Sequence, residues 1–444
     1  MSILKLLSFR GGVHPHDHKE ITKDKKITEL SPPDTLYIPM QMHIGAPCVP
    51  KVEVGERVLM GQIIGDSDAY VSVPVHASVS GTVKEIKKIL LPNGSMSDAV
   101  VIENDFKDEP FDEHGKNKDY TKFSRQEIIK MVREAGVVGM GGAGFPTHVK
   151  LSPPEGKVID TVIVNGAECE PYLTSDYRVM LENPEEVIYG LKVLLYAFGI
   201  KNGYIGIEDN KKEAIKKMQE KTKNEEGIRV VALKTKYPQG SEKQLIWSIT
   251  KREVPRGGLP ADVGVICVNI DTCCAIAKKF LYNRPLIRRI VTVSGSGIKE
   301  PQNFSVRIGT PFSYVIEAAG GMAGDVKKVI MGGPMMGIAQ YDLNVPVVKG
   351  TSAILLFTEK ELKQPNTDVC FRCGRCSYVC PINLMPYYIA DAYRIGDIER
   401  CEKLGALDCI ECGCCSFTCP GNAKPLSRVR EAKRTILENR RQKA

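Results

Sequence analysis

The chain has 444 residues, of which 43% are hydrophobic and 26% charged, so it is long enough for about three soluble domains with sizeable cores. Its net charge is +8 and only 7% of its residues are aromatic, which gives no reason to expect nucleic acid; an acidic partner protein or an anionic lipid surface fits equally well. The most apolar stretch, residues 187–200, contains Lys192 and is too short to cross a membrane, so we expect a buried helix there. The start of the chain lacks the apolar length and cleavage site of a signal peptide.

Residues 1–34 are polar and irregular, and we expect an N-terminal arm that ends at Ser31-Pro32-Pro33. His14, His16 and His18 alternate in this arm and could bind a metal ion. A solvated loop with idle histidines is the favoured interpretation, because the sequence fixes no acidic or cysteine ligand nearby.

Short β-runs separated by turns fill residues 35–105. Residues 54–62 and 75–83 resemble the two halves of a biotinyl/lipoyl barrel-sandwich domain, which carries a modifiable lysine at the hairpin tip between them. Here the tip reads Ser67-Asp68-Ala69-Tyr70. We therefore expect a structural or docking module without a swinging arm.

Strands and helices alternate from residue 160 to residue 285, within a predicted domain over residues 120–285. After a charged linker, a helix is expected to start at Ser124, where Glu127 completes a capping box. Predicted strands span residues 161–164, 204–207, 228–233 and 265–270, and predicted helices span residues 184–198, 211–221, 241–251 and 272–281. Such β-α repeats predict a mainly parallel sheet covered by helices, which binds ligands at the carboxyl ends of its strands.

Four loops of this domain carry residues suited to a flat ring or a phosphate. Residues 139–150 contain G-x-G-x-x-G, but the loop follows a helix rather than a strand, so an elaborate turn is the alternative. Its glycines would let backbone N–H groups approach a ligand. The other loops are residues 165–172, with two carboxylates, and residues 237–242 and 269–272, which open helices and favour an anion. Each reads equally well as an ordinary loop, but together they occupy the ligand-binding edge of the sheet.

The chain changes character after residue 285. Residues 286–357 mix strands with a helix near residues 311–319, which suggests a small β-grasp domain. The tail, residues 423–444, is a basic helix with Leu426, Val429 and Ile436 on one stripe. Docking to a membrane or an acidic partner is slightly favoured for this helix over packing on its own domain.

Between these two parts lie two cysteine runs of the form C-x2-C-x2-C-x3-C-P. In this bacterial ferredoxin pattern, three close thiolates hold one iron–sulfur cluster and the fourth cysteine ligates the other cluster. We therefore predict an α-helical, two-cluster ferredoxin-like domain over residues 365–422 that carries single electrons. The predicted ligands are Cys370, Cys373, Cys376 and Cys419 for one [4Fe–4S] cluster, and Cys409, Cys412, Cys415 and Cys380 for the second.

Two other interpretations of these cysteines are open. Zinc usually takes two separate C-x2-4-C pairs rather than a triplet with a trailing cysteine. Disulfides are disfavoured because the spacing is too local and regular for a secreted framework. The remaining free thiols indicate a reducing compartment.

The loops of the α/β domain carry a resemblance to a known family. The Phe145-Pro146-Thr147 end of the glycine loop, the Glu168-x-Glu170-Pro171 loop, the Gly240-x-Glu242 helix start and the Asn269-x-x-Thr272 turn resemble the NADH- and FMN-binding subunit of respiratory complex I. With the barrel-sandwich, β-grasp (SLBB-like) and two-cluster modules in this order, essentially the whole chain resembles the RnfC family, a component of Rnf, which is a membrane-bound ion-pumping ferredoxin:NAD+ oxidoreductase. This resemblance implies FMN, NAD(H) and two [4Fe–4S] clusters as cofactors.

The resemblance also implies residue roles. Phe145 would stack on the nicotinamide nucleotide, Glu170 and Glu242 would contact its ribose or amide, and Arg256 would stand at the position of a lysine in the complex I protein. The flavin would be held by Gly139, Gly141, Gly142, Gly144, Lys150, Asn165, Glu168, Tyr237, Gly240, Asn269 and Thr272.

Three positions depart from the complex I pattern. Met140 replaces an arginine, Leu259 an aromatic stacking residue and Ala167 an acid. The NAD(H) site is therefore less well defined by the resemblance than the FMN site.

The expected function follows from the two kinds of electron carrier. NAD(H) exchanges a hydride and a cluster exchanges one electron, and FMN converts between them without a general acid or base, so no catalytic side chain is expected. By resemblance, electrons from ferredoxin would arrive through integral membrane and ferredoxin-type partner subunits, and the chain would lie peripherally on the cytoplasmic face of the cell membrane. The alternatives are a microcompartment cobalamin reductase with the same module order, and a cluster-bearing scaffold that binds no nucleotide.

Overall fold

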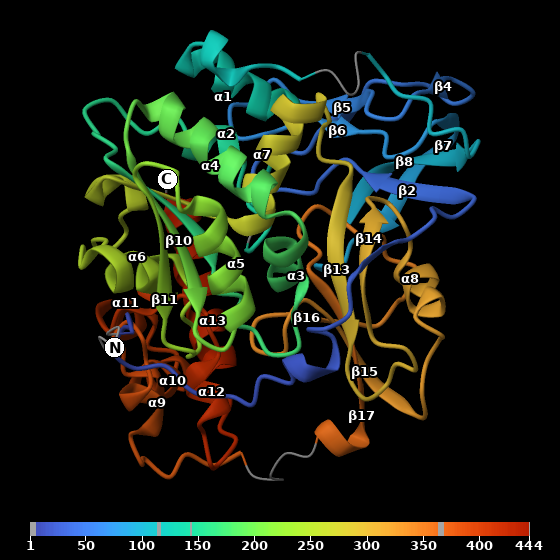
Figure 1. Ribbon diagram of the computed structural model, residues 1–444. Coiled ribbons are helices and arrows are strands. Elements are labelled where there is room, and N and C mark those ends of the chain that lie inside the picture. Colours follow the sequence, from blue (N-terminus) through green and yellow to red (C-terminus); the bar gives the residue numbers. More distant parts are fainter. Residues whose placement is uncertain (1–5, 113–116, 143, 363–367, 444) are drawn as a thin grey trace.

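The computed structural model describes residues 6–112, 117–142, 144–362 and 368–443 (Figure 1). Two small antiparallel sheets form the domain predicted over residues 35–105, and the alternating side chains of their strands bury Leu36, Ile38 and Ile102. One sheet has the order β2-β8-β7-β4 and the other β3-β5-β6. Their strands are β2 (Thr35–Pro39), β3 (Val49–Pro50), β4 (Arg57–Val58), β5 (Ile63–Asp66), β6 (Val75–His76), β7 (Gly81–Leu90) and β8 (Met96–Asn104).

The hairpin tip of this sandwich docks on the next domain. Arg133 donates to Asp66 Oδ1 over 2.9 Å and to the Ser67 carbonyl over 2.8 Å, and the His148 ring lies 3.0 Å from the Tyr70 carbonyl. The tip without a lysine is therefore an internal contact surface.

The next domain holds the predicted parallel sheet, in the order β11-β10-β9-β12. Val162 and Val164 of β9 pack toward α4 and α7, whereas Ile163 packs toward α6, so helices cover both faces. The capping box of Ser124 and Glu127 is confirmed. The elements are α1 (Arg125–Glu134), α2 (Thr147–Lys150), β9 (Thr161–Gly166), α3 (Ser175–Glu182), α4 (Pro184–Phe198), β10 (Asn202–Glu208), α5 (Lys212–Thr222), β11 (Ile228–Leu233), α6 (Glu242–Thr250), β12 (Val265–Asn269) and α7 (Ile270–Tyr282).

A six-stranded mixed sheet follows, in the order β1-β14-β13-β17-β15-β16. One face packs on α8 through Val291 and Val293, and the other face carries Leu355 and Phe357 against Tyr172 of the α/β domain. Its β-grasp classification stays a prediction. The elements are β1 (Ile27–Glu29), β13 (Arg288–Ser294), β14 (Gln302–Arg307), α8 (Phe312–Ala318), β15 (Val326–Met331), β16 (Ile338–Gln340) and β17 (Ala353–Thr358).

The cysteine-rich domain is helical and ends in the long basic helix. Leu426, Val429 and Ile436 of this helix are buried in the core of the same domain, so the expectation that this stripe docks on a membrane or partner is wrong. In the described residues, no helix combines the length and apolarity that a membrane crossing needs. The helices are α9 (Arg375–Tyr378), α10 (Pro386–Arg394), α11 (Ile398–Lys403), α12 (Cys414–Phe417) and α13 (Pro425–Lys443). Short 3-10 turns are η1 (Lys19–Ile21), η2 (Tyr120–Lys122), η3 (Pro260–Val263), η4 (Glu359–Glu361) and η5 (Ala406–Asp408).

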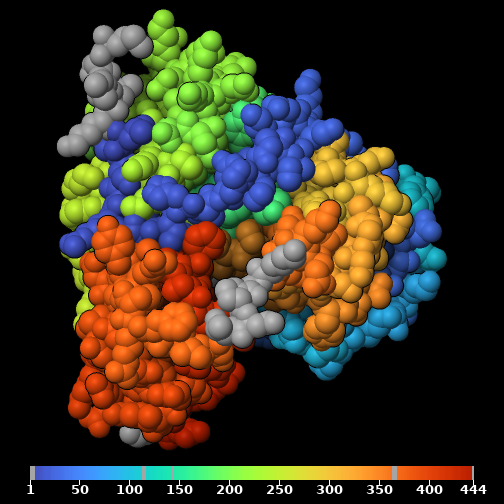
Figure 2. All heavy atoms as spheres, turned by 90° about the horizontal axis from the view of Figure 1, so that it is seen from below, coloured from blue at the N-terminus to red at the C-terminus, as the bar shows by residue number. Residues whose placement is uncertain are grey.

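The N-terminal arm is more ordered than its polar sequence suggests. It runs along the boundary between the cysteine-rich domain and the α/β domain (Figure 2) and then adds β1 to the edge of the mixed sheet, parallel to β14. The Gly12 N–H donates to the Val379 carbonyl over 2.7 Å, while Val13 and Tyr237 form a reciprocal antiparallel bridge. The arm therefore connects the cysteine-rich domain to the loop that contains Tyr237.

Two adjacent glycines make this close approach possible. A Cβ on Gly12 would lie 2.5 Å from the Tyr237 carbonyl oxygen, and one on Gly11 would lie 2.7 Å from the Cys380 carbonyl oxygen. Both residues have φ near +80°, which other residues rarely adopt. No larger side chain fits between the two domains without displacing backbone.

Candidate functional site

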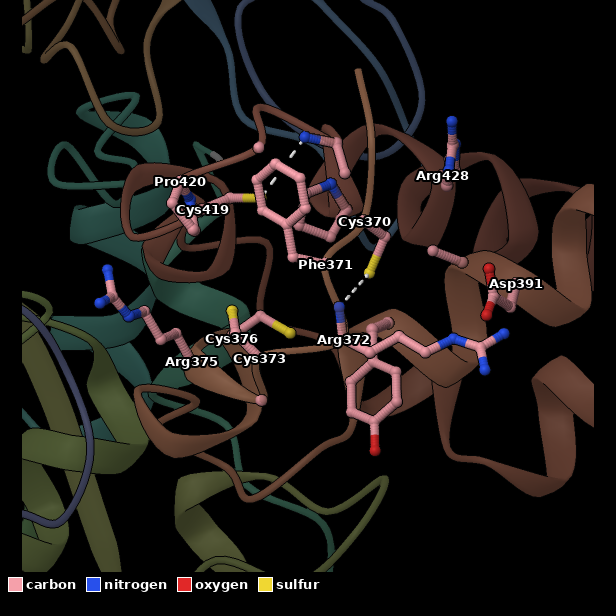
Figure 3. Close-up of a pocket in the computed structure, with 16 residues that line it drawn as sticks. Cys370, Phe371, Arg372, Cys373, Arg375, Cys376, Asp391, Cys419, Pro420 and Arg428 are labelled. Atoms are coloured by element: carbon pink, nitrogen blue, oxygen red, sulfur yellow. Dashed lines mark hydrogen bonds between the residues drawn. The ribbon is translucent and has the colours of Figure 1, made fainter. Parts of the chain in front are cut away.

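The eight cysteines of the two runs line two separate cavities in the helical domain. The outer cavity is lined by Cys370, Cys373, Cys376 and Cys419, whose sulfurs surround one central space (Figure 3). The inner cavity is lined by Cys380, Cys409, Cys412 and Cys415 of the pattern, and also by Cys414, which stands between two of its positions. These two groups are the crossed sets that the spacing predicts. All fifteen cysteines lie in the described residues and are free thiols, so the disulfide alternative is wrong.

The backbone around the two cavities follows one repeated plan. Left-handed residues stand at equivalent positions, Arg372 (φ 53) and Glu411 (φ 59), and each N–H donates over 3.4 Å to the sulfur two residues earlier. Later in each run, the N–H groups of Leu384 and Ala423 donate to Cys380 and Cys419 over 3.3 and 3.4 Å. Amides aimed at sulfur stabilise negative charge on a thiolate-bound cluster.

The donor set and the hollow between the sulfurs fit iron–sulfur clusters. In each cavity, the four thiols of the predicted set surround a space instead of converging on a single point. This arrangement suits a cluster, which is larger than a single metal ion. Burial raises the pKa of Cys409 to about 11 and that of Cys415 to about 12. These thiols therefore stay protonated at neutral pH unless a metal-bearing group binds them.

The two cavities differ in their surroundings. In the outer cavity Cys370 and Cys373 are exposed, and the neighbouring Phe371 ring is 61% exposed. In the inner cavity Cys380, Cys412 and Cys415 are each 8% exposed. Cys409 of the inner cavity is half-buried, so the outer cavity is the more exposed of the two at its cysteines.

The predicted flavin loops meet at the carboxyl ends of β9 and β12. The Met140 N–H donates to Thr272 Oγ1 over 3.0 Å, and a Cβ on Gly141 would lie 3.0 Å from Asn269 Nδ2. Asn269 also caps α7 by accepting from the N–H groups of Asp271 and Thr272. The glycine loop is therefore fixed directly over a helix N-terminus, a favourable place for a phosphate.

Two polar pairs complete this edge. Asn165 Nδ2 donates to the Gly240 carbonyl over 2.7 Å, and Lys150 Nζ donates to Glu242 Oε1 over 2.7 Å and to the Cys267 carbonyl over 2.9 Å. Amide, ammonium and glycine backbone donors around two helix starts suit the phosphate and ring edges of FMN. The residues present thus fit this cofactor.

The remaining glycine-loop residues are arranged around the same turn. Gly139 donates its N–H to the Phe145 carbonyl over 2.9 Å, and Phe145 is half-buried. Gly144 is buried with φ 70 and accepts a hydrogen bond from Ile44 of the sandwich domain. Gly142 is exposed, and nothing lies within 4 Å of the place its Cβ would take.

Glu170 connects the flavin loops to the mixed sheet. Its carboxylate accepts from the N–H groups of Met335 and Met336 over 3.0 Å each and from the Tyr237 hydroxyl over 3.4 Å. Burial raises its pKa to about 7, against the lowering effect of the two amide hydrogen bonds. Glu170 therefore titrates in the physiological range.

Glu168 has a structural task. It adopts φ 45, a region that residues other than glycine rarely enter, and its oxygens accept from the N–H groups of Asp176 and Tyr177 at the start of α3. Its pKa is raised to about 7 by burial, against the effect of Lys19, 3.9 Å away. These contacts give Glu168 a structural task, and its predicted role at the flavin stays a prediction.

Arg256 forms its ion pair with the cysteine-rich domain. Its guanidinium is exposed and forms an ion pair with Asp408, next to Cys409 of the inner cavity. The structure thus pairs Arg256 with the cysteine-rich domain, and its predicted position at the nucleotide stays a prediction.

The sequence did not predict several buried charged side chains of this region. Lys19 of the arm donates to the Glu170 carbonyl over 3.0 Å. Arg289, from the mixed sheet, is 2% exposed, forms an ion pair with Asp271 and contacts the sulfur of Met140 over 2.8 Å. A guanidinium from another domain thus reaches the loop position where complex I carries an arginine. No local pattern marks these residues, because their partners are distant in sequence.

Tyr237 is the meeting point of the flavin loops and the inner cavity. The side chain is 2% exposed and packs with Val13, Val379, Cys412 and Cys414 in one apolar cluster. The hydroxyl of Tyr237 donates a hydrogen bond to Glu170 over 3.4 Å. One residue therefore contacts both candidate redox sites.

Comparisons with known proteins agree with this architecture. Three family models match: the RnfC barrel sandwich hybrid domain over residues 7–107, the Nuo51 FMN-binding domain over residues 132–278 and the SLBB domain over residues 290–339.

Curated relatives match over most of the chain. The C subunit of the proton-translocating ferredoxin:NAD(+) oxidoreductase complex of Clostridium ljungdahlii is 48% identical over 382 residues, 86% of this chain and 83% of that protein. The C subunit of the Na(+)-translocating ferredoxin:NAD(+) oxidoreductase complex of Acetobacterium woodii is 46% identical over 437 residues, 98% of each chain. Among solved structures, an NAD+-reducing [NiFe]-hydrogenase overlaps 72% of this chain and 63% of its own with a TM-score of 0.49 and 18% identity.

Proposed function

The chain belongs to the RnfC family of ion-translocating ferredoxin:NAD+ oxidoreductase complexes, and we propose that it carries electrons between iron–sulfur clusters, FMN and NAD(H) in such a complex. The observation that carries this proposal is the contact of Tyr237 with both the flavin-type loops and the inner four-cysteine cavity. The family favours this role over the cobalamin reductase alternative.

FMN would bind where the glycine loop meets α7. Gly139, Gly141, Gly142 and Gly144 would offer backbone N–H groups, and Lys150 would offer its ammonium group. The other residues assigned to this pocket are Asn165, Glu168, Tyr237, Gly240, Asn269 and Thr272. When bound, FMN exchanges a hydride with NAD(H) and single electrons with clusters.

The nucleotide would lie on the same edge. Phe145 would stack on it, and Glu170 and Glu242 would accept hydrogen bonds from its ribose or amide. Arg256 belongs to this assignment only through the family resemblance, since its ion pair with Asp408 directs it to the other domain. In this proposal the protein supplies positions and charges, and hydride transfer to the flavin needs no general acid or base from a side chain.

Each cysteine cavity would hold one [4Fe–4S] cluster, giving two in the chain. The outer ligands would be Cys370, Cys373, Cys376 and Cys419, and the inner ligands Cys380, Cys409, Cys412 and Cys415. The exposure of the outer cavity supports contact there with a ferredoxin-type partner protein of the complex, and the burial of the inner cavity against Tyr237 supports a position next to the flavin. In this proposal, ferredoxin is an indirect electron donor.

The same proposal includes the place of the chain in the cell. It would lie peripherally on the cytoplasmic face of the membrane, held by the integral membrane subunits of the complex. Co-purification with these subunits, against release as a free chain, tests this part of the proposal.

Anaerobic purification with iron, sulfide, flavin and zinc measured together tests the cofactors. We expect about eight irons and about eight sulfides per chain, as two [4Fe–4S] clusters require, with one FMN. NADH should bleach the flavin and then reduce the clusters. Stoichiometric zinc without iron would overturn the cluster assignment, and flavin that NADH does not bleach would leave only the scaffold alternative.

A further inference from the structure

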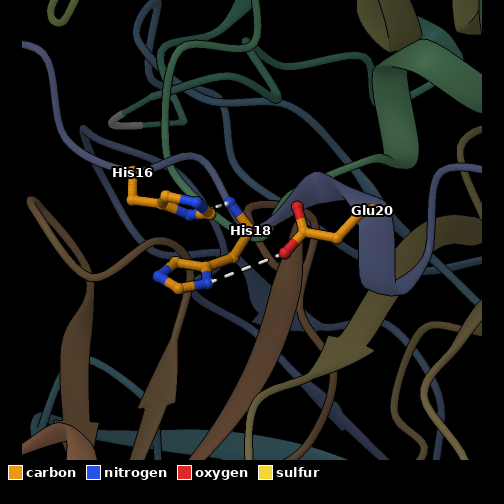
Figure 4. A group of neighbouring side chains, drawn as sticks. All are labelled: His16, His18 and Glu20. Carbon is orange, nitrogen blue, oxygen red and sulfur yellow. Dashed lines mark hydrogen bonds and ion pairs between the residues drawn. The ribbon is translucent and has the colours of Figure 1, made fainter.

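A group of metal-ligand side chains lies outside the redox sites, in the N-terminal arm. His16, His18 and Glu20 converge there (Figure 4), and each offers one ligand atom, all within 4.8 Å of one another. His18 Nδ1 lies 3.9 Å from Glu20 Oε1, and the two imidazole rings are 4.2 Å apart at 49°. The sequence favoured idle histidines because no acidic ligand was fixed nearby, and Glu20 supplies that ligand in the fold.

The backbone holds this group in place. His18 precedes the 3-10 turn η1 in the left-handed region (φ 48), and its N–H makes a long hydrogen bond of 3.4 Å to His16 Nδ1, which orients the His16 ring in the metal-free arm. A metal ion needs a free lone pair on the His16 ring, so metal binding would replace this hydrogen bond. The His18 ring stacks on Tyr172 with centroids 4.5 Å apart and an angle of 14°. The Tyr172 N–H in turn donates to the Asp17 carbonyl over 2.7 Å. The ligand segment is therefore fixed on the 170–173 loop.

Lys19, which lies between the ligands His18 and Glu20, anchors the segment further. It is 6% exposed, and its ammonium group donates to the carbonyls of Glu170 and Leu173. A rigid frame lowers the entropy lost when ligands are brought to one ion. The neighbouring Asp17 carboxylate is occupied by Asn210 Nδ2 at 2.9 Å, so Glu20 is the acidic ligand of the group.

We propose that His16, His18 and Glu20 bind one divalent transition-metal ion of the zinc class. Two imidazoles and one carboxylate are a donor set that zinc and its neighbours prefer, and water would fill the open position on this exposed surface. The bound ion would link the residues on both sides of Lys19 and hold the His18 ring in its stacked position on Tyr172. This site is independent of the cysteine cavities.

The test is a Co2+ titration of the cluster-loaded, chelator-washed full chain, followed by visible absorption and repeated with Zn2+ as competitor. Wild type should bind one ion with nitrogen and oxygen ligands. His16→Ala and Glu20→Gln should each weaken binding at least about tenfold, the lower end of what loss of a ligand's hydrogen-bond partner alone costs. His14→Ala is the matched control, because this exposed histidine of the same arm lies outside the group, and it should bind as wild type does.

A second measurement separates ligand loss from misfolding. Bound Zn2+ should slow proteolysis of the arm in wild type and in His14→Ala but leave the rate unchanged in Glu20→Gln. Unaltered Co2+ affinity in both His16→Ala and Glu20→Gln would overturn the proposal. So would an absorption spectrum of cobalt bound by thiolates, because the ion would then occupy the cysteine cavities.

Discussion

The two cysteine cavities share one backbone plan and have opposite surroundings. Left-handed turns and amide-to-sulfur hydrogen bonds recur at matching positions in both runs. The outer cavity nevertheless opens to solvent at Cys370 and Cys373, whereas the inner cavity packs against Tyr237. The local motif thus specifies the arrangement of the thiols, while contacts from distant segments decide which cavity is more exposed and which packs against the proposed flavin loops.

Removing one ligand from each cavity tests this comparison most strongly. Cys412→Ala and Cys373→Ala should each lose about half of the iron, because each removes one ligand of one cluster. In Cys373→Ala the inner cluster remains, and NADH should still reduce it. In Cys412→Ala only the outer cluster remains, and NADH should fail to reduce it because the inner cluster that connects it to the flavin is lost. Electron paramagnetic resonance after NADH addition measures both.

Cys401→Ala is the matched control for these variants. Cys401 is buried in the same domain but lines neither cavity, so its replacement should leave iron content and cluster reduction unchanged. Equal cluster reduction by NADH in Cys373→Ala and Cys412→Ala would contradict the inner and outer assignment.

The glycine contact between the domains gives the next largest effect. Gly12→Ala places a Cβ 2.5 Å from the Tyr237 carbonyl and should shift the inner cavity relative to the flavin loops. We expect cluster reduction to slow by about tenfold to a hundredfold, as small misplacements of reacting groups do in enzymes. Bleaching of the flavin by NADH should keep its wild-type rate. Stopped-flow absorbance follows both events in one experiment.

Gly94→Ala is the control for Gly12→Ala, because the two glycines have nearly the same φ. Gly94 has φ +83 against +80 at Gly12, but nothing lies within 4 Å of its added Cβ. Both variants carry the strain of a positive φ, and only Gly12→Ala carries the interdomain clash. A similar slowing in both would show that strain, rather than domain position, controls the rate.

Glu170 provides a pH-dependent test beside the inner cavity. Its pKa is raised from 4.5 to about 7, so the ionised fraction increases as the pH rises through 7. Because the carboxylate accepts hydrogen bonds from a ribose better than the acid does, NADH affinity should improve by up to about tenfold between about pH 6 and about pH 8. Glu170→Gln should flatten this dependence, as measured by NADH titrations of flavin-loaded protein.

Glu168 supplies the comparison for this test, since burial also raises its pKa to about 7. Its oxygens hold the start of α3, and the family resemblance assigns it to the flavin rather than to the nucleotide, so Glu168→Gln should keep the pH dependence of NADH binding. If the pH dependence were lost in Glu168→Gln and kept in Glu170→Gln, the titrating group would be Glu168, and the prediction for Glu170 would be wrong.

Much of the fold was predictable because its signals are local. The strand at residues 228–233 and the helix at residues 184–198 were predicted with their observed bounds, since β-α alternation and Pro184 mark them in the sequence. The two cysteine groups followed from spacing alone. Helix α3 was missed because the side chain that holds its start, Glu168, comes from the preceding loop.

The rest depends on contacts between residues far apart in the chain. The polar arm reads as irregular, yet Gly12 fits between two domains and Lys19 reaches the Glu170 carbonyl. Arg256 was assigned to the nucleotide through family resemblance, whereas the structure pairs it with Asp408. Local sequence patterns cannot predict such pairings, because they form only when the domains pack together.

The Arg256–Asp408 pair gives the smallest expected effect and decides between these two views of Arg256. The guanidinium is largely exposed, and exposed ion pairs contribute little, so Arg256→Gln should change the rate of cluster reduction by no more than about threefold. NADH affinity should stay within about twofold of wild type if Arg256 acts only between domains. Asp408→Asn should reproduce the same small change, because it removes the same pair. A large loss of NADH affinity in Arg256→Gln alone would instead place this residue at the nucleotide, as the family resemblance implies.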